Sequence, residues 1–319
     1  MSADPRPDYV ERPMYFDVDG EAVFGILTRS LDEHVDTAVI VLPGGGVPLT
    51  TNRNRLTVRI CRDLAGLGVA AFRMDYHGTG ESTGSVGGFH TGHPFWGDVR
   101  AAISRLKEEG LTRFVLVGSC FGSRTALSAA AHLDDVEEVL LFSVPLGDYA
   151  MGERKSVTTA QRHHLGHYAR AALRPRTWRA LLSRRGRWVL WNHARAKLRV
   201  IWTRLSRLAG RAPSSEPHAE HISPRFRRGL ERLIERGVPV TFVFGDDEDY
   251  HREFEEARRH ELGEILARGG SKVRIVTLPG RIHGFTTLAS QDASLGVITE
   301  WARGRRAGFV PGTPTDVAS

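Results

Sequence analysis

Cysteine is scarce in this sequence: Cys61 and Cys120 are the two among 319 residues. Two thiols are too few for a disulfide framework, which argues against the small disulfide-rich secreted classes and favours a reducing compartment. The first residues lack the apolar core of a signal peptide, and nowhere does a run of about 18 apolar residues offer a membrane span. These absences predict a cytoplasmic protein with no transmembrane segment.

Acidic residues are almost missing from one segment of the chain. Residues 150–212 hold 16 Arg or Lys and one acid, Glu153, for a net charge of +15. The other residues comprise 28 basic and 36 acidic side chains, a net charge of −8, so the overall +7 conceals a strong separation. Such a local excess predicts an anionic partner. Nucleic acid is not expected, because no recognition motif accompanies the charge.

Short β-branched runs alternate with helical patterns in both outer thirds, which is typical of a parallel sheet covered by helices. The patterns predict strands at 14–18, 22–28, 37–42, 69–75, 113–117, 136–144, 238–244 and 272–278, and helices at 54–67, 94–109, 121–132, 250–268 and 290–303. We therefore expect an α/β core at 1–146 and 225–305, an Arg- and Trp-rich helical lid at 147–224 inserted after the sixth strand, and a disordered tail at 306–319.

The strongest motif is Gly118-Ser119-Cys120-Phe121-Gly122, which joins an apolar strand to an Ala-rich helix. In a nucleophile elbow the central residue occupies a strained turn, and small residues two positions away on each side let strand and helix approach closely. Cys120 holds the central position, at a helix N-terminus where the dipole favours a thiolate. Ser119 is an alternative nucleophile, but it lies one position off centre. A buried structural cysteine is the other alternative.

His283 follows the last predicted strand, in a loop where a general base could reach the nucleophile. The acid that orients it should follow the strand at 238–244, where four carboxylates stand in a row at 246–249. Counting three residues past the turn glycine Gly245 selects Glu248, with Asp247 and Asp249 as alternatives. The run lacks the glycine and distal glutamate of a calcium loop, so no metal is expected.

The order of elbow, acid and histidine resembles the α/β-hydrolase superfamily, which the whole chain outside the lid and tail matches. Two more stretches are similar to it. Residues 39–46 resemble the superfamily's oxyanion loop, and residues 73–82 resemble its D-x-x-G-x-G-x-S turn. The resemblance implies an α/β-hydrolase fold with a mostly parallel sheet. It also implies an oxyanion hole in which Phe121 and either Gly45 or Gly46 donate backbone N–H groups.

Cysteine stands where most members of the superfamily have serine. A cysteine at this position resembles the nucleophile of dienelactone hydrolases, bile-acid conjugating acyltransferases and polyester synthases. Because some of these enzymes transfer the acyl group instead of hydrolysing it, we expect either acyl transfer or hydrolysis. The substrate would be an ester or thioester, free or carried on acyl carrier protein or coenzyme A, with no cofactor. One alternative is a lyase that eliminates a carboxylate such as acetate, by similarity to enzymes of tetronate biosynthesis. The other is a non-catalytic binding protein.

Arginines of the predicted lid are the candidate contacts for an anionic carrier or coenzyme. Arg184, Arg185 and Arg187 flank Gly186, a predicted break between lid helices, where their side chains can converge on one ligand. The alternative is that the lid helices bury their apolar faces while the arginines reach water.

Overall fold

The computed structural model describes residues 8–31, 35–45, 51–151 and 222–306. The chain divides into two compact units, residues 1–148 with 221–319, and residues 149–220. Most of the predicted lid at 147–224, with Arg184, Arg185 and Arg187, and all but the first residue of the predicted tail lie outside the described residues. Both therefore stay predictions.

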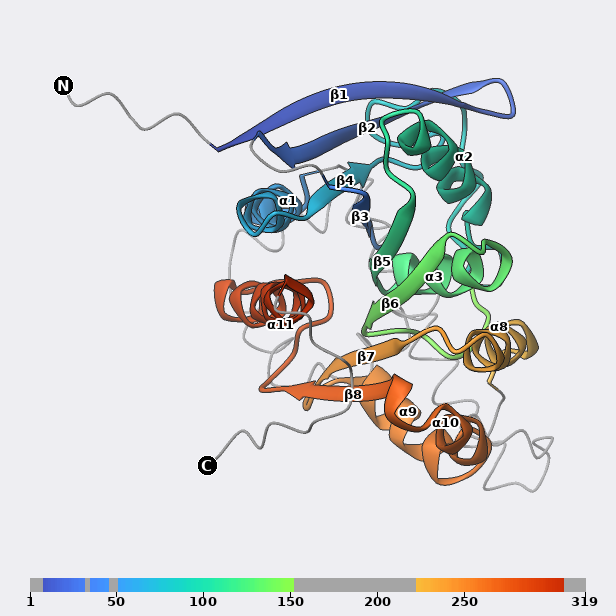
Figure 1. The fold of residues 1–319 in the computed structure, drawn as a ribbon. Coiled ribbons are helices and arrows are strands. Elements are labelled where there is room, and N and C mark those ends of the chain that lie inside the picture. The colour runs from blue at the N-terminus through green and yellow to red at the C-terminus, as the bar shows by residue number, and fades with distance from the viewer. Residues whose placement is uncertain (1–7, 32–34, 46–50, 152–221, 307–319) are drawn as a thin grey trace, which may run out of the picture. The chain divides into compact units, whose positions relative to one another are not determined.

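One eight-stranded sheet organises the first unit, in the spatial order β1-β2-β4-β3-β5-β6-β7-β8 (Figure 1). The two strands at one edge, β1 and β2, form a hairpin, and β2 is also antiparallel to β4. All the other neighbours are parallel. The strands are β1 (Tyr9–Val18), β2 (Glu21–Ser30), β3 (Thr37–Leu42), β4 (Ala70–Met74), β5 (Arg113–Ser119), β6 (Val136–Phe142), β7 (Val240–Gly245) and β8 (Val273–Leu278).

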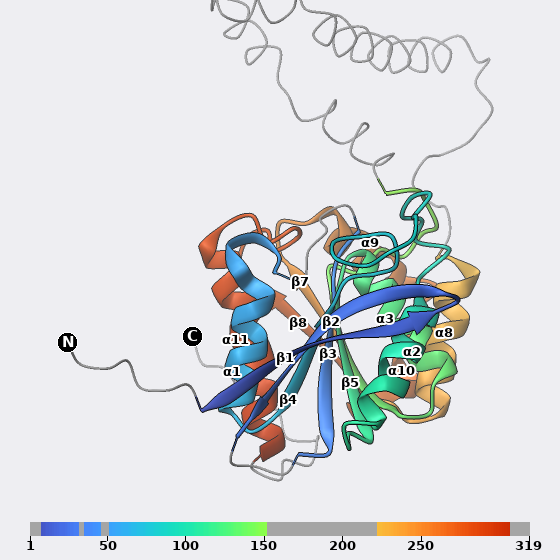
Figure 2. The same cartoon turned by 90° about the horizontal axis from the view of Figure 1, so that it is seen from above.

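The central strands are largely apolar because helices cover both faces of the sheet. Every residue of β3, β4 and β7 is buried. One face is covered by α1 (Leu56–Gly66) and α11 (Leu288–Arg306), and the other by α2 (Trp96–Lys107), α3 (Phe121–His132) and α8 (Pro224–Glu235) (Figure 2). The core between the sheet and the first pair includes Val39, Val115, Leu64, Ile298 and Ala302.

The prediction of a single helix over residues 250–268 is wrong. Two helices, α9 (Asp249–Arg259) and α10 (Gly263–Gly269), occupy this stretch. The Ala257 carbonyl accepts hydrogen bonds from the N–H groups of both His260 and Leu262, which closes a tight turn. Leu262 is fully buried beyond that turn. Burial of this side chain accounts for the break in an otherwise charged helical pattern.

The parallel topology brings the carboxyl ends of six strands, β3 to β8, to one edge of the sheet. Leu42 of β3 pairs with Gly118 of β5, Ser119 pairs with Phe142 of β6, and Gly245 of β7 pairs with Leu278 of β8. Residues that follow these carboxyl ends therefore share one edge, where ligands bind in open α/β sheets.

Candidate active site

Cys120 sits in the turn between β5 and α3, with φ of 52° and ψ of −112°. A positive φ is strained for a residue with a side chain, and such strain concentrates at functional sites. The surrounding structure holds the turn: the Cys120 N–H donates to the Phe142 carbonyl at 2.9 Å. The side chain is 5% exposed. The local geometry is that of a nucleophile elbow.

The two flanking glycines are required by close backbone contacts. A Cβ on Gly118 would lie 2.3 Å from the Gly122 carbonyl oxygen, and a Cβ on Gly122 would lie 2.4 Å from the Leu42 carbonyl oxygen. Both distances are far below van der Waals contact. The G-x-C-x-G spacing thus lets α3 start directly against β3 and β5.

The structure separates the four carboxylates at 246–249 by burial. Asp246 and Asp247 are exposed, and Asp249 begins α9, where its carboxylate accepts a hydrogen bond from Arg252. Glu248 is 1% exposed and turns inward. Of the three predicted candidates, only Glu248 is a buried acid.

The Glu248 carboxylate anchors the loop that carries His283. One oxygen accepts hydrogen bonds from the backbone N–H groups of Ile282, at 2.7 Å, and of His283. The other oxygen accepts from the Ser143 hydroxyl at 2.8 Å. Ser143, at the end of β6, is itself buried and has a φ of 45°. The acid and the histidine loop are therefore joined directly.

Tyr250 connects this group to the cysteine. Its hydroxyl oxygen lies 3.8 Å from the Cys120 Sγ, and its ring packs edge-on against the His283 ring with centroids 4.9 Å apart. Cys120, His283 and Glu248 are thus gathered around one buried tyrosine. Sequence reasoning missed Tyr250 and Ser143. The available signal was their position just after β7 and β6, at the edge where the other site residues lie.

The predicted oxyanion residues lie beside the elbow. Phe121 is the first residue of α3, so its N–H has no intrahelical acceptor. A Cβ on Gly45 would touch the Phe121 Cβ at 3.0 Å, and one on Gly44 would lie 3.7 Å from the Cys120 Cβ. The loop after β3 therefore borders the cysteine. Gly46 lies outside the described residues.

An aromatic cluster fixes Phe121 in place. Its ring packs against Phe89 and Phe95, with centroids 5.0 Å apart in both pairs, and against Tyr76 at 5.8 Å. The Tyr76 hydroxyl donates to the Pro43 carbonyl at 3.2 Å, which ties the turn after β4 to the loop after β3. The turn at 73–82 that resembles the superfamily's thus braces both sides of the candidate oxyanion hole.

Strand order, elbow and the carboxyl-edge position of the site define an α/β-hydrolase fold, and the predicted fold class is confirmed. A family model described as serine aminopeptidase, S33, matches residues 34–179. No curated protein matches the sequence. The matched range includes the elbow, but here its central residue is cysteine rather than the serine of the family's description.

Solved structures share the fold at low sequence identity. An esterase from Pyrococcus furiosus is 16% identical, with a TM-score of 0.55, covering 93% of this chain and 91% of its own. Brefeldin A esterase, a bacterial homologue of human hormone-sensitive lipase, is 19% identical, with a TM-score of 0.52, covering 96% and 81%. Proline iminopeptidase from Mycobacterium smegmatis is 15% identical, with a TM-score of 0.51, covering 93% and 99%. The family match covers less than half of the chain, and these structures, all under 25% identical, show the shared fold.

The described residues offer neither a membrane-spanning helix nor a metal-binding cluster. None of the helices there is both long and apolar enough to cross a membrane. Within the same residues, no group of three or more His, Cys, Asp or Glu side chains is placed to hold a metal ion.

Proposed function

We propose that this chain is a cysteine-dependent acyl hydrolase or acyltransferase acting on an ester or thioester. The observation that carries the proposal is the strained Cys120 at the elbow, gathered with His283 and the buried Glu248 around Tyr250. Strain of this kind in a buried turn is expected at a functional site rather than at an ordinary core cysteine. The two neighbouring structures named as esterases support the same reaction class.

In the first half-reaction the Cys120 Sγ attacks the acyl carbonyl while its proton passes to His283. A tetrahedral intermediate forms, and its oxyanion accepts hydrogen bonds from the Phe121 N–H and from a glycine N–H of the loop after β3. Collapse breaks the bond to the leaving oxygen or sulfur, which takes the proton from His283. The product of this step is an acyl thioester on Cys120.

In the second half-reaction water, an amine or a thiol attacks that thioester. His283 accepts the proton of the attacking group and returns it to the departing Cys120 sulfur. Glu248 stabilises the imidazolium form of His283 and fixes its loop. Glu248 is the preferred acid over Asp247 and Asp249 because a buried carboxylate acts in a lower dielectric, where its field is stronger.

Tyr250 has the role of a positioning residue in this proposal. Its hydroxyl, 3.8 Å from Sγ, can donate to a Cys120 thiolate, and a hydrogen bond to the charged form lowers a thiol pKa. We expect Tyr250→Phe, which keeps the ring against His283, to move the acid limb of the kcat/KM profile to higher pH. A lower rate with an unmoved profile would contradict this role.

Intact-protein mass spectrometry after incubation with acyl thioesters and p-nitrophenyl esters tests the covalent step. The adduct should form on wild type and on Ser119→Ala and be absent from Cys120→Ala. Cys61→Ala is the matched thiol control: burial raises the pKa of Cys61 to about 12, so its removal should leave the adduct intact. An adduct that survives in Cys120→Ala but not in Ser119→Ala would refute the assignment. A product with a new double bond and no adduct would favour the lyase instead.

The acyl group's carrier is proposed to be anionic, as in acyl carrier protein or coenzyme A. Support comes from the net charge of +15 on residues 150–212, beside a net charge of −8 on the rest of the chain. Such a charge distribution raises the encounter rate with an anionic partner at low ionic strength.

A further inference from the structure

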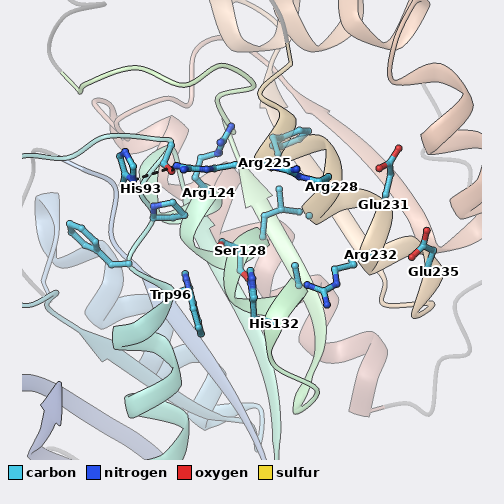
Figure 3. Close-up of a pocket in the computed structure, with 17 residues that line it drawn as sticks. His93, Trp96, Arg124, Ser128, His132, Arg225, Arg228, Glu231, Arg232 and Glu235 are labelled. Carbon is cyan, nitrogen blue, oxygen red and sulfur yellow. Dashed lines mark hydrogen bonds between the residues drawn. The ribbon is translucent and has the colours of Figure 1, made fainter. Parts of the chain in front are cut away.

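A groove of about 870 Å³ runs between α2, α3 and α8, away from the candidate catalytic residues. We call it the α8 groove. None of Cys120, Glu248 or His283 lines it (Figure 3). Its lining includes Arg124, Arg225, Arg228, Arg232, Glu231 and Glu235.

Two of these charged groups are already neutralised by neighbours. Arg124 is buried and forms an ion pair with Asp148 at 2.6 Å. Glu231 pairs with Arg227 at 3.2 Å and with Arg268 at 3.6 Å. Among the described residues of the groove, the charges left to face a ligand are therefore Arg225, Arg228 and Arg232 against Glu235.

These three arginines form one stripe along α8. Positions 225, 228 and 232 are three and four residues apart, so they share one face of the helix, and all are exposed. Arg225 reaches the Gly92 carbonyl and lies 3.4 Å from the His93 Nδ1, which closes one end of the groove. Within the described part of the chain, the side chains of Arg228 and Arg232 form no hydrogen bond or ion pair. Like charges at this spacing repel one another unless an anion lies between them.

The floor and far wall of the groove are apolar and aromatic. Leu127 and Ala131 of α3 and Phe226 of α8 line it. Trp96 stacks on His132 with ring centroids 4.7 Å apart and an angle of 11° between the rings. Figure 3 shows Trp96 and His132 on the side of α2 and α3, and Arg228 and Arg232 on α8. A ligand here would meet guanidinium groups on one side and carbon surface on the other.

We propose that the α8 groove binds the phosphate of a small organic phosphate. Guanidinium groups form bidentate hydrogen bonds with phosphate oxygens, and several arginines together match a group with two negative charges and several acceptors. The apolar floor accommodates the organic part of the ligand. This site is separate from Cys120 and does not depend on the reaction proposed above.

Isothermal titration of the full chain in phosphate- and sulfate-free buffer at low salt tests the site, with ADP and pyrophosphate as separate probes. We expect one site per chain. The Arg228→Gln/Arg232→Gln variant should weaken binding by at least about tenfold, the loss expected for charge-assisted hydrogen bonds. The matched control is Arg29→Gln/Arg259→Gln, which removes two exposed arginines from β2 and α9 outside the groove.

The control matters because the chain carries many other arginines. Equal weakening in both double variants would mean diffuse attraction and would overturn the proposal, as would the absence of binding by both probes. Unchanged thermal midpoints without ligand would exclude unfolding as the cause of a loss. Pyrophosphate binding as tight as ADP binding would overturn the role of the apolar floor while supporting the phosphate site. Cys120→Ala should bind both probes like wild type.

Discussion

Replacing Glu248 by glutamine separates the structural role of this carboxylate from its proposed catalytic role. The amide is nearly isosteric with the carboxylate. Its oxygen can still accept from the N–H groups of Ile282 and His283, and its NH₂ group can donate to the Ser143 hydroxyl, which then acts as acceptor. The loop that carries His283 should therefore keep its position.

The magnitudes follow from these contacts. Changing charge-assisted hydrogen bonds to neutral ones weakens each by about 1 kcal/mol, so Glu248→Gln should lower the free energy of unfolding by about 1–3 kcal/mol. Glu248→Ala leaves two buried N–H groups without an acceptor and should cost about 2–6 kcal/mol. Catalysis should respond far more. An amide in place of a triad carboxylate lowers kcat by about 10⁴ in a serine protease, and we expect a loss of about 10³–10⁴ here.

Urea unfolding and hydrolysis of p-nitrophenyl acetate measure the two effects on the same protein. Asp247→Asn is the matched control, since Asp247 lies next to Glu248 in the chain but is exposed. It should alter neither quantity. Near-normal turnover in Glu248→Gln would reduce Glu248 to a structural anchor, and a large loss in Asp247→Asn would transfer the acid's role to that residue.

Three further predictions concern the elbow, a buried acid and the charged segment. Gly118→Ala should abolish folding or cost more than about 3 kcal/mol, because its Cβ would overlap a backbone oxygen, whereas Gly66→Ala, with open space around it, should stabilise by about 0.4–1 kcal/mol, as chemical denaturation would show. Burial raises the pKa of Glu138, so the folded state becomes less stable relative to the unfolded state as the pH rises through that pKa and the side chain ionises. Glu138→Gln should therefore be more stable than wild type near pH 7 but equal to it in acid, as urea unfolding at the two pH values would show. Replacing Arg184, Arg185 and Arg187 with glutamate should raise the KM for a coenzyme A or carrier-protein thioester and make that KM less dependent on salt. Turnover of a neutral ester should stay unchanged. Equal losses on both substrates would mean misfolding.

Much of the fold could be predicted because strands buried on both faces of the sheet appear in the sequence as short, nearly continuous apolar runs. The strand Thr37–Leu42 and the helix Phe121–His132 were predicted with the bounds that the structure has. The helix Pro224–Glu235 was missed because its arginines merge with those of the preceding segment. Its start signal was present: the Ser223 hydroxyl caps the helix by accepting from Arg225 and Phe226, and proline occupies the first turn.

The sequence could predict only those site residues that are recognised by their position directly after a strand. Cys120 and His283 stood out by their positions after strands. The count from Gly245 selected Glu248 but left Asp247 and Asp249 as alternatives, because adjacent carboxylates differ only in burial, which depends on the tertiary structure. The contact between Tyr250 and Cys120 was equally invisible, since it joins residues 130 positions apart.

The buried Arg124 also bears on how this chain tolerates change. Its guanidinium binds Asp148 and the Ser223 hydroxyl, and the Ser223 N–H donates to the Leu146 carbonyl at 2.9 Å. Arg124 also donates to the backbone carbonyls of Pro145 and Leu146, so one buried guanidinium joins residues 145–148 to Ser223. Arg124→Lys would keep the positive charge but lose the planar set of N–H donors, so it is not a conservative change at this position.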